Sequence, residues 1–209
     1  MRFSHRGALS VRRWITIALG VGLVMVACGG SGGYVPAGIV RSPAPDVSGV
    51  SLLDVASGND FAFQAEPGGL LVVFWGYTSC PDVCPTTLAD LRRAMRDMGE
   101  SAEVIDVAMV TIDPNRDTPE VLAAFVQVFF PDGRAIRTED AAALAAAAVP
   151  FGASYEVTAN PDGLVDVAHT GFLYAIDENG LIRLTWPFGT NSDDIRLDLE
   201  SLLKEGNNA

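Results

Sequence analysis

Two cysteines four residues apart are the part of this sequence that most clearly predicts chemistry. Cys80 and Cys84 lie in the segment FWGYTSCPDVCPTTLADL. If this stretch is helical, both thiols lie on one face about one turn apart, and if it is a loop they can still turn toward a common centre. Such a pair can exchange a disulfide or bind one metal ion. Two inert core cysteines are the alternative, which the flanking Pro81, Asp82 and Pro85 disfavour.

One histidine is available to complete a metal site with these thiols. The sequence contains His5 and His169, and His5 lies in the N-terminal export signal described below. Two thiolates and one imidazole suit copper, as Cu(I) or Cu(II), whereas a structural zinc site normally has four protein ligands. We therefore rank copper ahead of zinc, with one ion per chain. A metal-free redox pair remains open here, as does a plain loop or core role for His169.

The position of the two cysteines also predicts reactive thiols. They follow an apolar run, Leu70 to Trp75, and come just before a helical pattern that begins at Thr86. A helix N-terminus stabilises negative charge and so favours the thiolate that both metal binding and disulfide exchange require. We expect a lowered thiol pKa at this site.

The first 27 residues have the layout of an export signal. Four arginines and no acidic residue accompany an apolar run from Trp14 to Ala27, which is too short to be a comfortable membrane span. The run ends before Cys28 and GGSGG, which resembles the lipobox of bacterial lipoproteins, although Met25 stands where that pattern favours leucine. In a lipobox the peptide is cut before the cysteine and the thiol is lipidated. We therefore expect a lipoprotein signal peptide at 1–27.

Lipidation at Cys28 would place the protein at the cell membrane, anchored by lipid and facing the periplasm or the cell exterior. An uncleaved or plainly secreted form is the alternative. Residues 28–45 are rich in glycine, proline and serine, and predict a flexible linker. The folded domain is then residues 46–209.

The charge of the exported part excludes one class of partner. Without the four arginines of the signal, ten basic and 26 acidic side chains remain, a formal charge of −16. A phosphate backbone attracts basic surfaces, so nucleic acid is not an expected partner. The acidity fits solubility or the steering of cations and basic protein faces.

The elements that must position these residues alternate between strand and helix. The pattern predicts buried strands over Leu70 to Trp75 and Val104 to Ile112, and an amphipathic helix between them over Thr86 to Met98. A second helix follows Pro119, and a hairpin turns at Asn179-Gly180 before a last helix. This order indicates an α/β, thioredoxin-like fold with a mixed sheet and helices on both faces. Sites in such sheets lie beyond the carboxyl ends of strands, where the cysteines fall.

Three segments in order resemble the Sco/SenC family of copper-binding assembly factors for cytochrome c oxidase. They are FWGYTSCPDVCPTTLADL, VTIDPNRDTPEVLAAF and HTGFLYAIDENG, and the likeness extends from about Val50 to Leu203. The resemblance implies Cys80, Cys84 and His169 as copper ligands. It also implies a copper metallochaperone or thiol-disulfide reductase that helps to assemble the binuclear copper centre of a respiratory oxidase. The implied partners are the copper-accepting subunit of that oxidase and other copper chaperones.

The sequence departs from that family at one position beside the histidine. Family members usually carry an aspartate directly before it, whereas this chain has Ala168, with Asp166 two residues earlier. Metal-bound imidazoles commonly rely on a neighbouring carboxylate or carbonyl. We therefore consider Asp166 as a substitute support, and Asp113, which follows a predicted strand, as a second residue close to the ligands.

Two other functions would use the same residues. In a peroxiredoxin-like or general thiol-disulfide oxidoreductase without metal, Cys80 and Cys84 are the catalytic redox pair, and His169 has no ligand role. The usual redox pair is CxxC, whereas this chain has CxxxC. A copper sensor or buffer would use the copper ligands without an oxidase.

Overall fold

The computed structural model describes residues 34–160 and 165–206. The predicted signal peptide, 1–27, and Cys28 lie outside the described residues. Within the described ranges, no helix is both long and apolar enough to span a membrane.

Seven strands form one mixed sheet in the order β2-β1-β5-β4-β3-β8-β9. The three central strands β5, β4 and β3 are parallel to one another, and the outer strands pair antiparallel. A separate two-stranded sheet pairs β6 with β7. The main-sheet strands are β1 (Ser51–Asp54), β2 (Asp60–Ala62), β3 (Leu70–Gly76), β4 (Ile105–Thr111), β5 (Arg134–Arg137), β8 (Leu173–Ile176) and β9 (Ile182–Trp186).

The central strand β3 is buried along its whole length. All seven of its residues are buried, and it pairs in parallel with β4 and antiparallel with β8. A strand covered on both faces needs apolar side chains in both directions, which explains the continuous run LLVVFW. The strand predicted over Leu70 to Trp75 is confirmed.

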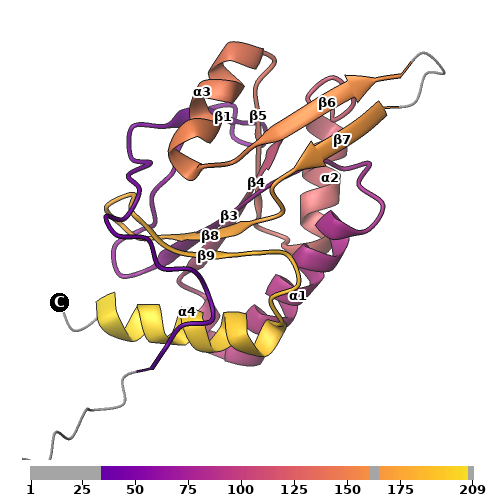
Figure 1. The fold of residues 1–209 in the computed structure, drawn as a ribbon. Coiled ribbons are helices and arrows are strands. Elements are labelled where there is room, and N and C mark those ends of the chain that lie inside the picture. The colour runs from indigo at the N-terminus through magenta and orange to yellow at the C-terminus, as the bar shows by residue number, and fades with distance from the viewer. Residues whose placement is uncertain (1–33, 161–164, 207–209) are drawn as a thin grey trace, which may run out of the picture. The chain divides into compact units, whose positions relative to one another are not determined.

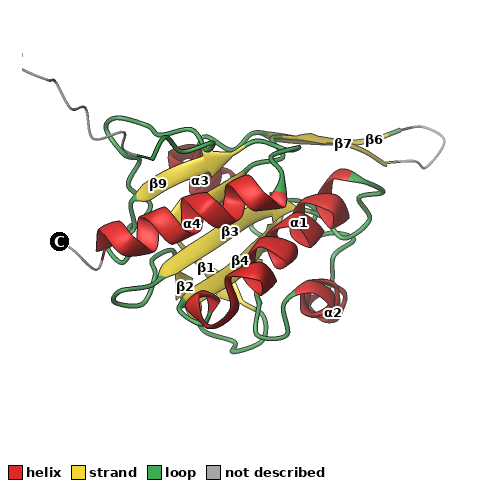
Figure 2. Cartoon of the chain, turned by 90° about the horizontal axis from the view of Figure 1, so that it is seen from below, coloured by secondary structure: helices red, strands yellow, loops and turns green. Residues whose placement is uncertain are grey.

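Helices cover both faces of the sheet, as predicted. The helices α1 and α4 lie against one face, and α3 lies over the other (Figures 1 and 2). Helix α2 packs against β5 and α1, and it begins with Pro119 directly after the capping residue Thr118, whose Oγ1 accepts from the Val121 amide at 3.3 Å. The helices are α1 (Val83–Met98), α2 (Pro119–Phe129), α3 (Ala141–Phe151) and α4 (Ser192–Gly206), with a 3-10 turn at Gly99–Ala102.

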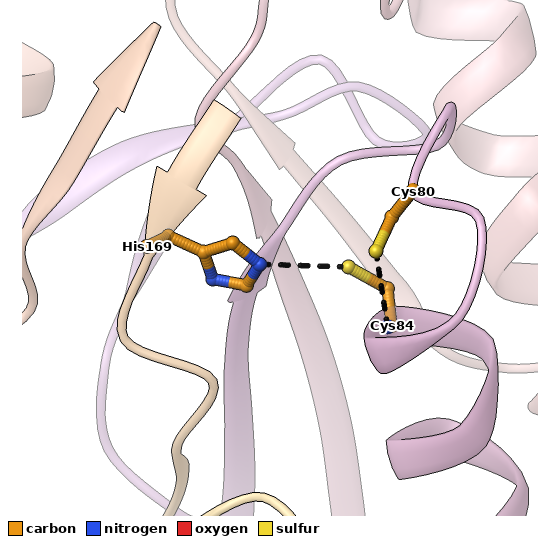
Figure 3. A group of neighbouring side chains, drawn as sticks. All are labelled: Cys80, Cys84 and His169. Carbon is orange, nitrogen blue, oxygen red and sulfur yellow. Dashed lines mark hydrogen bonds between the residues drawn. The ribbon is translucent and has the colours of Figure 1, made fainter. Parts of the chain in front are cut away.

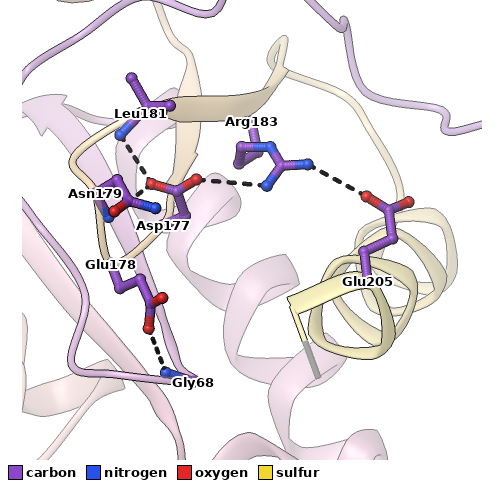
Figure 4. Close-up of polar contacts among 7 residues, drawn as sticks. All are labelled: Gly68, Asp177, Glu178, Asn179, Leu181, Arg183 and Glu205. Atoms are coloured by element: carbon purple, nitrogen blue, oxygen red, sulfur yellow. Dashed lines mark hydrogen bonds and ion pairs between the residues drawn. The ribbon is translucent and has the colours of Figure 1, made fainter. Parts of the chain in front are cut away.

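The predicted hairpin at Asn179-Gly180 joins β8 to β9. Gly180 has a φ of +73°, which favours glycine, and Asp177 Oδ1 accepts from the amides of Asn179 and Leu181 (Figure 4). Arg183 lies 3.4 Å from Asp177 and 3.3 Å from Glu205 of α4. These partly exposed ion pairs contribute little energy individually. They connect the β8–β9 turn to helix α4.

The N-terminal part of the described chain differs from the flexible linker predicted up to residue 45. It packs against the domain, where Asp198 of α4 is fully buried and needs hydrogen-bond donors. The carboxylate of Asp198 accepts from Tyr34 Oη (2.6 Å), Ala37 N (3.1 Å), Gly38 N (2.8 Å) and Trp186 Nε1 (2.7 Å). Backbone hydrogen bonds between Ile39 and Thr185 then add this segment to the edge of β9. The predicted linker is therefore wrong for residues 34–45.

A hairpin that we did not predict carries the histidine. Strands β6 (Tyr155–Ala159) and β7 (Val165–His169) pair antiparallel and project from the domain (Figure 1). Side chains along β7 alternate between partly buried and exposed, which matches Val165, Asp166 and Val167 in the sequence. His169 is the last residue of β7.

Candidate metal centre

Three separate elements bring the predicted ligands together. Cys80 lies in the loop between β3 and α1, Cys84 is the second residue of α1, and His169 ends β7. The helix begins at Val83, earlier than the predicted Thr86, so Cys84 is helical and Cys80 is not. The three side chains point toward one another (Figure 3).

The donor atoms of this site lie close enough to bind one ion. The sulfur atoms of Cys80 and Cys84 and a ring nitrogen of His169 all lie within 4.8 Å of one another. Cys84 Sγ is 3.8 Å from His169 Nε2, and Cys80 Sγ accepts from the Cys84 amide at 3.2 Å. Both cysteines are free thiols. For metal–ligand distances of roughly 2.0–2.3 Å, as in zinc sites, one ion fits among the three with small side-chain shifts.

Glycine at the end of β3 makes room for one of the sulfur atoms. A Cβ added at Gly76 would lie 3.1 Å from Cys84 Sγ and 2.4 Å from the ring of Phe74. Any larger residue would push Cys84 away from the imidazole. The strand end and the helix start therefore fit together only because this position has no side chain.

The electrostatics of Cys84 differ from the prediction. The side chain is fully buried, and this burial raises the pKa of the Cys84 thiol well above its usual range, because the thiolate loses its hydration. The hydrogen bond with Cys80 raises it further. The expected lowering by the helix N-terminus is wrong for Cys84, which is protonated at neutral pH when no metal is bound.

The imidazole of His169 is neutral and can act as a metal ligand. Burial lowers its pKa, because the charged form would lose hydration. Nδ1 lies 3.2 Å from the carbonyl oxygen of Thr170, and a carbonyl only accepts, so Nδ1 is the protonated nitrogen in this contact. Nε2, the atom nearest Cys84, then has its lone pair free. The Thr170 carbonyl lies where metal-bound imidazoles commonly have a carboxylate or carbonyl partner, the place for which Ala168 provides no side chain.

The two carboxylates predicted to support the ligands have other partners. The Asp113 side chain is buried and pairs with Arg116, and Asp166 accepts from the Asn160 amide at 2.8 Å. In the part of the chain that the structure describes, neither contacts His169 or a cysteine sulfur. The prediction that they lie next to the ligands is therefore wrong.

Aromatic rings pack around the imidazole of the site. The rings of Tyr77 and Phe74 stand edge-on to His169, with centroids 5.8 and 6.2 Å away. The Tyr77 side chain also makes a hydrogen bond with Cys80. Burial, and after it the electrostatic interaction with Cys80, raises the pKa of Tyr77 to about 12. The phenol therefore stays neutral beside the thiols. These rings restrict the imidazole to the orientation that faces Cys84.

The sequence alone did not reveal a role for Asp117, which lies near the site. It is fully buried, and it accepts from the amide and hydroxyl of Thr78, two residues before Cys80. The residue that caps α2 is its neighbour Thr118. In the segment TIDPNRDTPE we considered only Asp113 as a residue close to the ligands.

Comparisons with known proteins agree with this geometry. The SCO1/SenC family model matches residues 46–204. A SCO2-like protein of Rickettsia prowazekii is 32% identical over 126 residues, which are 59% of this chain and 61% of that protein.

Two solved structures share the fold. ScoI of Bradyrhizobium japonicum, solved with copper bound, is 26% identical with a TM-score of 0.62, over 72% of this chain and 95% of that chain. Apo Sco1 of Thermus thermophilus is 27% identical with a TM-score of 0.67, over 82% and 98%. Because the matched residues 46–204 include every strand of the main sheet and all three donors, the chain belongs to the SCO1/SenC family.

Proposed function

We propose that this protein binds one copper ion through Cys80, Cys84 and His169 and helps to assemble the binuclear copper centre of a respiratory cytochrome c oxidase. The observation that carries the proposal is the group of two free thiols and one neutral imidazole, with donor atoms within 4.8 Å of one another. Family membership supports the oxidase as the target, and the copper-bound ScoI structure supports copper as the ion.

The chemistry of the donors explains why copper suits this site. Soft thiolates favour Cu(I), and the imidazole adds a donor that Cu(II) also accepts. Copper here is cargo, so the site must bind it and then release it to the copper-accepting subunit or receive it from another chaperone. Of the three ligands only His169 is partly exposed, so a docked partner would approach the ion from the side of the imidazole.

The same thiols support a second step in assembly. Cys80 and Cys84 can reduce a disulfide in the target, in which case their two sulfur atoms form a disulfide and the target gains two thiols. Both this reaction and copper transfer require the partner to dock at the same face. A metal-free oxidoreductase is the rival function, but it does not require His169 Nε2 to face Cys84 Sγ at 3.8 Å. A copper sensor or buffer shares the ligands, and loss of oxidase assembly on gene deletion would distinguish it.

Copper titration of the reduced protein under anaerobic conditions tests the proposal. We expect one ion per chain, read by metal analysis and by thiolate-to-copper absorption. Because the pKa of Cys84 is raised, copper must displace its proton, so binding strengthens as pH rises through the neutral range. The expected slope is about tenfold in affinity per pH unit for each proton displaced. No bound copper with both thiols free would exclude the metallochaperone function.

We also propose that lipid on Cys28 anchors the protein to the cell membrane, outside the cytoplasm. The support for this is the lipobox-like sequence before a separate folded domain. The Cys28→Ser variant should leave the membrane fraction and keep one bound copper, because the lipid and the copper ligands are on different residues. Fractionation and metal analysis of the same sample measure both. Loss of copper in this variant would contradict the assignment of Cys28 to the anchor alone.

A further inference from the structure

The buried carboxylate of Asp117 joins the ends of two parallel strands near the metal centre. It accepts from the Thr78 amide at 3.0 Å, the Thr78 hydroxyl at 2.5 Å and the Thr111 hydroxyl at 2.6 Å. Thr111 is the last residue of β4, and Thr78 lies just beyond the end of β3. Among the described residues no cation pairs with this carboxylate. The nearby Arg137 donates to the main-chain oxygen of Asp117 and not to its side chain. A buried carboxylate held only by neutral donors is costly, and its role has to explain that cost.

Two of the three donors belong to the loop that carries a copper ligand. Thr78 is two residues before Cys80, and the Cys80 amide donates to the Tyr77 carbonyl at 3.3 Å. The position of Thr78 therefore fixes the short path from the strand to Cys80. At the end of that path, Cys80 Sγ accepts from the Cys84 amide at the start of α1. The carboxylate thus acts on the ligand through two residues of backbone.

Activation of the thiols is not a suitable explanation for Asp117. Burial is the main cause of the raised pKa of Cys84, and the negative charge of Asp117 adds to it. A carboxylate that opposes thiolate formation does not make the thiols more reactive. Its contribution is geometric.

We propose that Asp117 is a positioning residue for copper binding, which holds the Thr78–Cys80 loop so that Cys80 Sγ faces Cys84 and His169. This role rests on the proposed function. A loop without its hydrogen bonds to Asp117 would sample positions in which Cys80 points away from the other two ligands. Copper binding would then have to order this loop, and the cost of ordering it would lower the copper affinity.

The test compares three variants of the exported protein. In Asp117→Asn one carboxylate oxygen becomes an NH₂ group, so the side chain can no longer accept from Thr78 and Thr111 through both of its oxygens, and Thr78→Val removes the hydroxyl but keeps the side-chain shape. Both should lower copper affinity by about 10–100-fold, the range for residues that support metal ligands, and change the thiolate-to-copper absorption. The double variant should be no weaker than Asp117→Asn alone, because both changes remove the same contact.

Thr111→Val is the matched control. It removes a buried hydroxyl that donates to the same carboxylate and accepts from the Asp113 amide at 3.0 Å, both on the β4 side, and it leaves both Thr78 contacts in place. It should lower the melting temperature and keep the wild-type absorption. If Asp117→Asn and Thr78→Val also keep wild-type affinity and absorption, the positioning role is overturned.

A readout without copper separates this inference from the proposed function. Cys80 is 9% exposed in the reduced protein. Release of its loop in Asp117→Asn or Thr78→Val should make Cys80 react several-fold faster with iodoacetamide, measured by mass spectrometry of the Cys80 peptide. If the wild type binds no copper, the proposed function fails, but faster alkylation in these variants would still support the positioning role. Unchanged alkylation in both variants would overturn it.

Discussion

Substitution of Cys84 by serine should abolish tight copper binding while the domain stays folded. Structural zinc sites with four ligands have apparent binding free energies of about 10–16 kcal/mol, which is roughly 3 kcal/mol per ligand. Loss of one ligand from a three-ligand site should therefore weaken binding on the order of 100-fold or more. The loss should be largest for Cu(I), which prefers sulfur to oxygen. Anaerobic titration against a competing chelator measures this.

Serine is the right replacement because the site at Cys84 is fully buried and tightly packed. The sulfur fills the space next to Gly76, so a larger side chain would disturb β3, and alanine would leave a cavity. Cys80→Ser should give a similar loss of copper, and Cys28→Ser is the control, since it also removes one thiol. Retention of wild-type affinity in Cys84→Ser would mean that the ion binds elsewhere.

The parts of the fold that were predictable have local causes. The run LLVVFW has to be a strand buried on both faces, Pro119 starts a helix, and Asn179-Gly180 makes a tight turn, because each pattern limits the backbone by itself. The cluster of Cys80, Cys84 and His169 was predictable because few residues of the exported chain offer soft donors and because its motifs resemble those of the Sco/SenC family. These predictions needed no knowledge of tertiary contacts.

The errors concern contacts between distant parts of the chain. Residues 34–45 have the composition of a linker, but they pack because Asp198, about 160 residues later, accepts from Tyr34, Ala37 and Gly38. No local pattern shows that a surface helix has a buried acid facing this segment. The raised pKa of Cys84 has the same origin, since burial outweighs the local effect of the helix N-terminus.

The segment from Asp113 to Asp117 shows how a turn decides which side chain reaches a site. The Asp113 carbonyl accepts from the amides of Arg116 and Asp117, which makes a tight turn after β4. This turn directs Asp117 back toward the strand ends, while the Asp113 side chain pairs with Arg116. The spacing of two aspartates in a sequence does not specify such a reversal. Only the backbone path shows which of them reaches the loop of Cys80.

Substitution of His169 by alanine should separate the copper function from a metal-free redox function. A disulfide between Cys80 and Cys84 needs no imidazole, whereas a site with three ligands loses one donor. We expect Cu(II) affinity to fall on the order of 100-fold, by the same estimate of roughly 3 kcal/mol per ligand, and Cu(I) affinity to fall less, since Cu(I) can stay on two thiolates. The thiolate-to-copper absorption should shift or disappear.

The fold and the thiols should survive this change, because His169 is only partly buried and lies at the end of the β6–β7 hairpin, outside the main sheet. Circular dichroism and the reversible oxidation of Cys80 and Cys84 check both points. The matched control is Thr170→Ala, which keeps the main-chain carbonyl that contacts His169 Nδ1 and so should keep wild-type copper binding. If His169→Ala binds Cu(II) with wild-type affinity and absorption, then Nε2 is not a ligand in spite of its position 3.8 Å from Cys84 Sγ. The two thiols would then form the whole site, and thiol-disulfide exchange with the target would be the better account of their function.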